Sequence, residues 1–283
     1  VIGDFMGLAV GDFDQNGFPD LYTTNVPVGN ALLLNAGDGT FVESADVAGV
    51  LALVTGWGTH FLDFDNDGDE DLYVVNAIDP DMLFENTGVF PAIDIAASVG
   101  LAIAGSNAFC SAVADIDGDG DLDILLQNFF EGIRLFVNNA NDNGNPTRHW
   151  LKVKLDGLGA NRFGVGARVD VGINGSVQSR QVLAGVGYKS SSSLVQHFGL
   201  GTATLVDSVT VTWPGGATTF IQNVAADQTL HIMQEGPTTV PAMSVWGLAC
   251  MTLLLLCLAT LVLSRAGGGT CSDVLSGGRA RAR

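Results

Sequence analysis

Three stretches of this 283-residue chain repeat one pattern of aspartate and glycine, and this repeat limits the possible folds more than any other feature. The stretches read GDFDQNGFPDLYTTN, LDFDNDGDEDLYVVN and ADIDGDGDLDILLQN, and their first loop aspartates, Asp12, Asp63 and Asp115, lie 51 and 52 residues apart. An asparagine follows each copy at the same offset: Asn35, Asn86 and Asn138. A period of about 50 residues predicts a repeat architecture.

The spacing of oxygen-bearing side chains within each copy predicts a metal site. They fall at positions 1, 3, 5 and 9 of the loop, a glycine at position 6 permits a sharp turn, and position 7 offers a backbone carbonyl. This spacing matches a calcium loop, and oxygen donors rich in carboxylate favour calcium over zinc or copper. The candidate ligands are Asp12, Asp14, Asn16, Phe18 and Asp20; Asp63, Asp65, Asp67, Asp69 and Asp71; and Asp115, Asp117, Asp119, Asp121 and Asp123.

The residues after the loops exclude an EF-hand. Its twelfth position requires a glutamate that opens a helix, whereas Thr23, Val74 and Leu126 stand there, inside β-favouring runs. The alternative to a metal site is an Asp-Gly hairpin turn with solvated charges. Three copies in register favour the metal site, and Asn16 predicts that the first site binds calcium more weakly.

The rest of each copy predicts short strands, which are GLAVGDF, DLYTTN, ALLLN and TFVES in the first copy. An all-β repeat of about 50 residues has the length of a propeller blade. The predicted fold class is all-β: a partial β-propeller of about three calcium-loop blades, then a β-rich domain and one C-terminal transmembrane helix. Because closed propellers have about 4–8 blades, we expect the chain to be truncated at its N-terminus.

Residues 1–140 resemble the FG-GAP/VCBS repeats of integrin-like propellers. The phrases LLLNAGDGTF, AGV, GWG and DFDNDGDEDLYVVN are similar to the form of these repeats in the cartilage acidic protein family. The resemblance implies blades that calcium stabilises.

Residues 149–234 predict a second all-β unit, because segments such as WLKVKL and SVTVTW alternate apolar and polar side chains. The segments NRFGVGARV, GVGYKSSSS, HFGLG and VTWPGG resemble the ASPIC/UnbV domain. That resemblance implies an extracellular or envelope protein and no known reaction. Basic side chains reappear in this unit, and their alternating positions predict solvated surface: Lys152, Lys154, Arg162, Arg168 and Arg180.

The chain offers little evidence for catalysis or for nucleic-acid binding. Its 30 acidic and 12 basic residues give a formal charge of −18, which disfavours phosphate backbones as partners. The histidines are dispersed along the sequence and are expected to be packed or edge residues: His60, His149, His197 and His231. Ser190 to Ser193 supply hydroxyl groups without an evident base. We therefore expect no enzyme active site in this segment.

The C-terminal region predicts a membrane anchor. Residues 235–244 form a linker, and the uncharged residues 245–264 are long enough to cross the hydrocarbon core as a helix. The basic tail, residues 265–283, is expected in the cytoplasm by the positive-inside rule. Residues Pro241, Ser244, Trp246 and Gly247 resemble the IPTL-CTERM sorting signal, which implies a possible sorting protease as a partner.

The function expected from these features is that of a calcium-binding, surface-exposed bacterial protein. It would act as a binding or adhesion module for an extracellular protein or polysaccharide, because propeller loops are common recognition surfaces. Two alternatives remain open: an envelope enzyme with its active site in missing N-terminal blades, and a structural matrix component.

Overall fold

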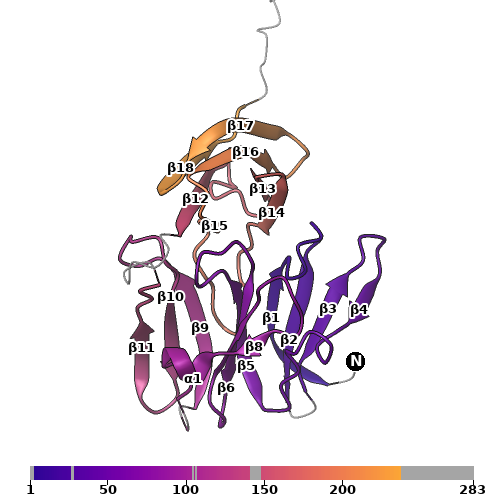
Figure 1. The fold of residues 1–283 in the computed structure, drawn as a ribbon, viewed down its shortest axis with the longest axis vertical. Helices are drawn as coiled ribbons and strands as arrows, with labels where there is room; N and C mark the ends of the chain where they lie inside the picture. Colours follow the sequence, from indigo (N-terminus) through magenta and orange to yellow (C-terminus); the bar gives the residue numbers. More distant parts are fainter. Residues whose placement is uncertain (1–2, 27–28, 104, 106, 141–147, 237–283) are drawn as a thin grey trace, which may run out of the picture. The chain divides into compact units, whose positions relative to one another are not determined.

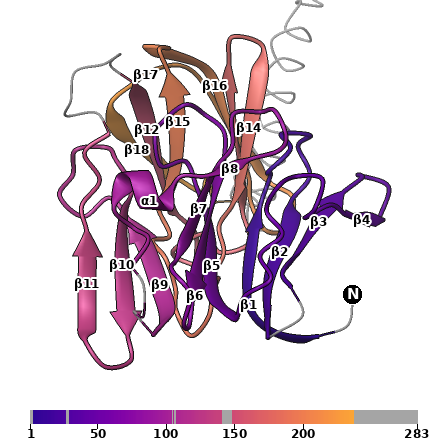
Figure 2. The ribbon, with the colours of Figure 1, turned by 60° about the horizontal axis from the view of Figure 1, so that its bottom comes forward.

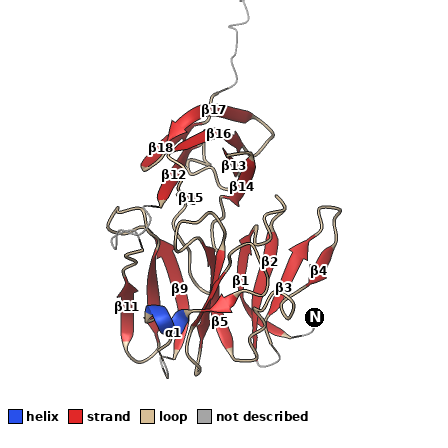
Figure 3. Cartoon of the chain, in the orientation of Figure 1, coloured by secondary structure: helices blue, strands red, loops and turns tan. Residues whose placement is uncertain are grey.

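The computed structural model describes residues 3–26, 29–103, 105, 107–140 and 148–236. The chain divides into two units, residues 1–235 and 236–283, and the fold and sites below belong to the first unit. The described residues of this unit are all-β apart from one short helix, α1 (Ala96–Val99), as Figure 3 shows. The predicted membrane helix, residues 245–264, and the sorting motif and tail lie outside the described residues. In the part that is described, no helix has the length and apolar character needed to cross a membrane.

The first two copies of the repeat each form a four-stranded antiparallel sheet with its strands in sequence order. Each strand hydrogen-bonds the one that follows it, so each sheet is a meander (Figure 1). The strands of the first sheet are β1 (Asp4–Gly11), β2 (Asp20–Val26), β3 (Ala31–Asn35) and β4 (Phe41–Glu43). Those of the second are β5 (Gly56–Leu62), β6 (Asp71–Asn76), β7 (Met82–Glu85) and β8 (Ile93–Asp94).

The third copy forms a three-stranded sheet in the order β11-β10-β9. Its strands are β9 (Ala108–Ala114), β10 (Asp123–Asn128) and β11 (Gly132–Phe136). The sequence accounts for this difference, because the third copy has no counterpart of the Gly-Thr-Phe segment that opens β4 in the first copy. The sheets therefore agree with the predicted blades.

The middle sheet is buried on both faces. All six residues of β6 are buried, and successive side chains of a strand point to opposite faces. Leu72 and Val74 join a core cluster with the first sheet, which includes Tyr22 and Leu32. Tyr73 and Val75 join a second cluster with the third sheet. The first strands of the three sheets, β1, β5 and β9, lie next to one another (Figure 2).

The second domain packs a three-stranded sheet, β15-β12-β18, against a four-stranded one, β14-β13-β16-β17. The strands β12 and β18 pair in parallel, and the other pairs in these sheets are antiparallel. The strands are β12 (His149–Asp156), β13 (Arg168–Ile173), β14 (Ser176–Gln181), β15 (Gln196–Gly201), β16 (Leu205–Thr212), β17 (Thr218–Ala225) and β18 (Gln228–Met233).

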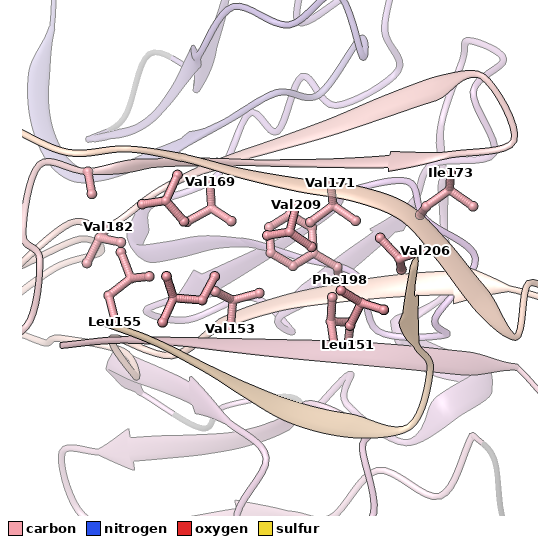
Figure 4. Packing of buried hydrophobic residues seen from close by; sticks show 14 of the residues in the cluster. Leu151, Val153, Leu155, Val169, Val171, Ile173, Val182, Phe198, Val206 and Val209 are labelled. Carbon is pink, nitrogen blue, oxygen red and sulfur yellow. The ribbon is translucent and has the colours of Figure 1, made fainter. Parts of the chain in front are cut away.

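Alternation along these strands builds the core of the second domain. Leu151, Val153 and Leu155 of β12 are buried, and they face Val169 and Val171 of β13 across the core (Figure 4). The segment between β14 and β15 leaves this domain and runs along the first strands of the repeats. In it Gly187 pairs with Leu8 through two backbone hydrogen bonds of 2.7 and 3.2 Å.

Candidate functional site

The three acidic loops join the first and second strands of their sheets and share one backbone geometry. In each loop the carboxylate at position 1 accepts a hydrogen bond from the backbone N–H of the glycine at position 6, for example Asp12 from Gly17. The three glycines, Gly17, Gly68 and Gly120, have φ values of 86°, 102° and 97°. This left-handed conformation strains any residue with a Cβ, which explains the glycine at position 6.

The aspartate at position 9 fixes the loop to its sheet. Asp71 accepts hydrogen bonds from the backbone N–H groups of Phe64 (3.0 Å) and Asn86 (2.8 Å). Asp20 and Asp123 accept the corresponding pairs of bonds in the other two loops. All three carboxylates are buried, with at most 1% of the residue exposed. The repeated asparagine that follows each loop therefore supplies a backbone donor to position 9.

The structure brings together the predicted ligands at positions 1, 3 and 9. One carboxylate oxygen from each lies within 4.8 Å of the others in three groups: Asp12, Asp14 and Asp20; Asp63, Asp65 and Asp71; Asp115, Asp117 and Asp123. Three hard oxygen donors at this separation match the donor set that calcium prefers. The chemistry and spacing of the side chains thus fit a divalent cation in each loop.

The predicted ligands at positions 5 and 7 have other hydrogen bonds. The side-chain oxygen at position 5 accepts a bond from the backbone N–H at position 7, for example Asp67 from Asp69 at 2.9 Å. The side chains at position 7 of the second and third loops, Asp69 and Asp121, accept bonds from the preceding loop.

Adjacent loops are linked to one another through position 4. Asn66 donates to the carbonyl oxygen of Gly120 at 3.3 Å and to Oδ1 of Asp121 at 2.7 Å. Gln15 makes the equivalent bonds to Gly68 and Asp69 of the second loop. The three acidic loops therefore form a connected row, a feature that the spacing of residues within one loop does not reveal.

The repeated asparagine also links neighbouring blades. The side-chain amide of Asn86 donates to the carbonyl oxygens of Phe13 (2.8 Å) and Glu70 (3.1 Å), and its oxygen accepts from Gly88. The amide of Asn35, in an exposed setting, donates to Pro19 of its own blade at 3.1 Å.

We expect Asn86→Ala to lower the free energy of unfolding by about 2–3 kcal/mol, because it leaves buried carbonyl groups without a donor. Its matched control, Asn35→Ala, should cost less than about 1 kcal/mol because solvent replaces the lost bond. Urea unfolding of both variants checks this, and equal costs would contradict an inter-blade role for Asn86.

Burial raises the pKa of several loop carboxyl groups. Desolvation brings the pKa of Asp12, Asp20 and Asp67 to about 6 and that of Asp63 to about 8. The pKa of Asp71 is also raised well above its usual value, mainly by desolvation. These shifts show that the fold disfavours the charged loops when no cation compensates them.

Three of the five basic side chains predicted to be solvated surface, Lys152, Arg168 and Arg180, instead contact these loops, as does Arg148 of the preceding segment. Lys154 and Arg162 are exposed as predicted. Lys152 pairs with Asp115, and Arg180 with Glu70 at 3.1 Å, in side chains that are only 14% and 10% exposed. Arg168 donates to the carbonyl oxygen of Gly17 at 2.8 Å, and Arg148 pairs with Asp65 at 2.5 Å. The alternation of apolar and polar residues along the strands correctly places the basic side chains of the second domain outside its core. It does not show whether solvent or another part of the protein covers the polar face of each strand.

Two glycine positions show how closely the second domain approaches the loops. The backbone N–H of Gly199 donates to Asp63 at 3.0 Å, and a Cβ at Gly199 would lie 2.1 Å from that carboxylate. A Cβ at Gly120 would lie 1.8 Å from Nε1 of Trp150. Each position requires glycine because a side chain would push the two surfaces apart.

Two of the four histidines are buried where the second domain meets the repeats. Nε2 of His60 donates to the carbonyl oxygen of Ser111 at 2.9 Å, so its Nδ1 accepts from the Ser192 hydroxyl at 3.3 Å. Burial lowers the pKa of His60 to about 4. The sequence did not indicate this pairing, because the two residues lie in different domains. The bond from Ser192 holds the segment between β14 and β15 against the repeats, and the bond to Ser111 links β5 to β9.

Comparisons with protein-family models agree with this division of the chain. The FG-GAP-like repeat model matches residues 12–74 and 63–126, and the ASPIC and UnbV model matches residues 157–239. A search of curated proteins found no match. Among solved structures, the chain is similar to a triple arginine-to-alanine mutant of AofleA from Arthrobotrys oligospora. The two are 11% identical with a TM-score of 0.33, over 82% of this chain and 76% of the other. The chain carries FG-GAP-like repeats followed by an ASPIC and UnbV domain.

Proposed function

We propose that this protein is a calcium-binding, surface-exposed bacterial protein that recognises an extracellular protein or polysaccharide. The observation that carries the proposal is the threefold aspartate triad, whose oxygens lie within 4.8 Å of one another in each loop. Three carboxylates held this close are costly without a cation, and calcium takes oxygen ligands from loops of this spacing. Extracellular calcium at millimolar level suits such sites, since extracellular modules bind it with Kd of about 10⁻⁴–10⁻³ M.

The role of calcium in this proposal is structural. Each ion would hold one loop in a single shape, and the bonds of Gln15 and Asn66 would transmit that order to the next loop. Ordered loops at the ends of strands are suited to recognition, because a rigid scaffold positions their side chains. The resemblance of residues 241–247 to a sorting signal, and the uncharged apolar sequence of residues 245–264, support a location at the cell envelope.

Two measurements on the full chain test the proposal. Isothermal titration should give about three calcium ions per chain, and Asp65→Ala and Asp117→Ala should each remove one. The labelled chain should then be retained on a glycan array or on immobilised envelope proteins in calcium and released by chelator. A chain that binds no calcium, or whose retention is indifferent to chelator, would contradict the proposal.

A further inference from the structure

In each of the first two blades, one pair of residues faces the next blade. Tyr22 of β2 lies opposite Leu32 of β3, and both are fully buried in the cluster shared with the second sheet. One repeat later, Tyr73 of β6 lies opposite Leu83 of β7, and these two are buried in the cluster shared with the third sheet, at 0% and 1% exposure. Because alternate residues of a strand share one face, these pairs mark the same face of each sheet, which we call the forward face.

The forward face of the third blade is uncovered. Its pair is Leu125 of β10 and Leu135 of β11, which lie opposite each other and are 37% and 46% exposed. Ile133, two residues before Leu135 on the same face, is 65% exposed. The third strands of the other two blades pair with a fourth strand, whereas β11 is an edge strand in the described part of the chain. Exposed apolar side chains that gather in one place, rather than lying singly, mark an interaction site.

The first blade leaves the complementary face partly open. In the second blade, Leu72 and Phe84 lie opposite each other on the reverse side of the sheet, and they are buried in the cluster shared with the first blade at 0% and 5% exposure. We call this side of a sheet the back face. The equivalent pair of the first blade, Leu21 and Leu33, has the same register but is only half-buried. The described chain thus carries both halves of the contact between blades, one at each end of its row of sheets.

We propose that the forward face of the third blade binds the back face of the first blade in a second copy of this chain. The contact repeats, between copies, the packing that joins the first blade to the second and the second to the third. It is heterologous, since two different surfaces meet, and heterologous contacts form a ring when their rotation closes. Two copies supply twice the three sheets of one chain, and six blades fall within the range of about 4–8 in closed propellers.

A second copy would therefore cover both open faces through two identical contacts. Blades that precede this sequence in a longer protein are the other candidate occupant of these faces, and they would leave this chain monomeric. The inference goes beyond the proposed function and does not depend on the ligand assigned there.

Sedimentation equilibrium of the full chain, in a density-matched non-ionic detergent with excess calcium, tests the inference. The wild-type chain should sediment with the mass of two chains. Leu135→Asp should return the mass of a single chain, because it places a charge inside an apolar contact. Leu135 is 46% exposed in the single chain, so this variant should keep its fold and its calcium stoichiometry. The matched control is Leu205→Asp in the second domain, where Leu205 is 47% exposed, and it should keep the mass of two chains.

A variant of the back face tests the head-to-tail arrangement. Leu33→Asp should also sediment as a single chain. Mixing it with Leu135→Asp should restore a species with the mass of two chains, because the first blade of one variant and the third blade of the other are both intact. Where Leu33→Asp fails to fold, the comparison of Leu135→Asp with Leu205→Asp still decides whether the third blade forms a contact between copies.

Three results would overturn the inference. The first is a wild-type chain with the mass of a single chain, which would leave the forward face of the third blade free. The second is a Leu135→Asp variant that keeps the mass of two chains, as it would if the apolar residues 245–264 held the copies together. The third is a mixture of the two variants that stays at the mass of a single chain.

Discussion

Chelation of calcium at about pH 7.5 is expected to lower the melting temperature of the full chain by roughly 10 °C. Each site filled at ten times its Kd adds about 1.4 kcal/mol of stability, so three sites add about 4 kcal/mol. One kcal/mol corresponds to about 2–4 °C for a chain of this size. Differential scanning calorimetry in calcium and in chelator measures the difference.

In chelator, the free energy of unfolding of the calcium-free protein is expected to depend on pH. The pKa values of Asp12, Asp20 and Asp67 are raised to about 6 and that of Asp63 to about 8, above the value of 3.8 for an unperturbed aspartate. Between pH 3.8 and about 8 the folded state therefore binds more protons than the unfolded state, so the free energy of unfolding falls as the pH rises through this range. The stability that protonation gives is complete below pH 3.8 and is lost as pH rises through about 6 and then 8.

Without calcium, these carboxyl groups should make the chain lose stability between about pH 5 and 8, whereas calcium should remove most of this loss because the cation replaces the protons. Magnesium at the same concentration is the control, since it dehydrates reluctantly and demands a tighter octahedral site. A melting temperature that rises over this pH range in chelator would show that the loop carboxylates are not the groups in control.

Asp71→Ala is expected to lower the free energy of unfolding by about 3 kcal/mol even in chelator. The substitution removes the acceptor of two backbone N–H groups, on Phe64 and Asn86, at a residue that is 1% exposed. Each unsatisfied buried donor costs about 1–3 kcal/mol. We expect the cost of leaving these two N–H groups without an acceptor to exceed the energy gained by no longer burying the carboxyl group, because both donors lie where the loop meets its sheet.

Asp65→Ala is the matched variant from the same loop. Asp65 belongs to the same triad, but it pairs with Arg148 through side chains that are 18% and 31% exposed, so its loss in chelator should cost less than about 1 kcal/mol. Calcium titration should show one ion lost in either variant. Equal destabilisation in chelator would contradict the separate roles of positions 3 and 9.

The sequence predicted the repeats well because their period, loop spacing and strand alternation are local properties. It located all four strands of the first blade and most strands of the second domain. It did not predict β15, because HFGLG carries two glycines and does not alternate. The sequence could also predict that the three aspartates of each triad come together, since positions 1, 3 and 9 lie within nine residues of one chain segment.

Local sequence patterns could not predict the contacts between the repeats and the second domain. Lys152 and Asp115, or Ser192 and His60, are brought together by tertiary packing over separations that no period describes. Alternation states which side chains leave the core of their own domain, but not whether solvent or another domain receives them. A cavity between the acidic loops and the second domain also follows from that packing.

The segment between β14 and β15 limits how these domains can be recombined. Its Gly187 pairs with Leu8 of the first repeat, and its Ser192 contacts His60 of the second and Val113 of the third. A chimera that joins these repeats to a different C-terminal domain would expose the backbone and histidine groups that this segment now covers. When domains are exchanged between homologous proteins, the three repeats and the domain that carries this segment should therefore be transferred together from the same parent.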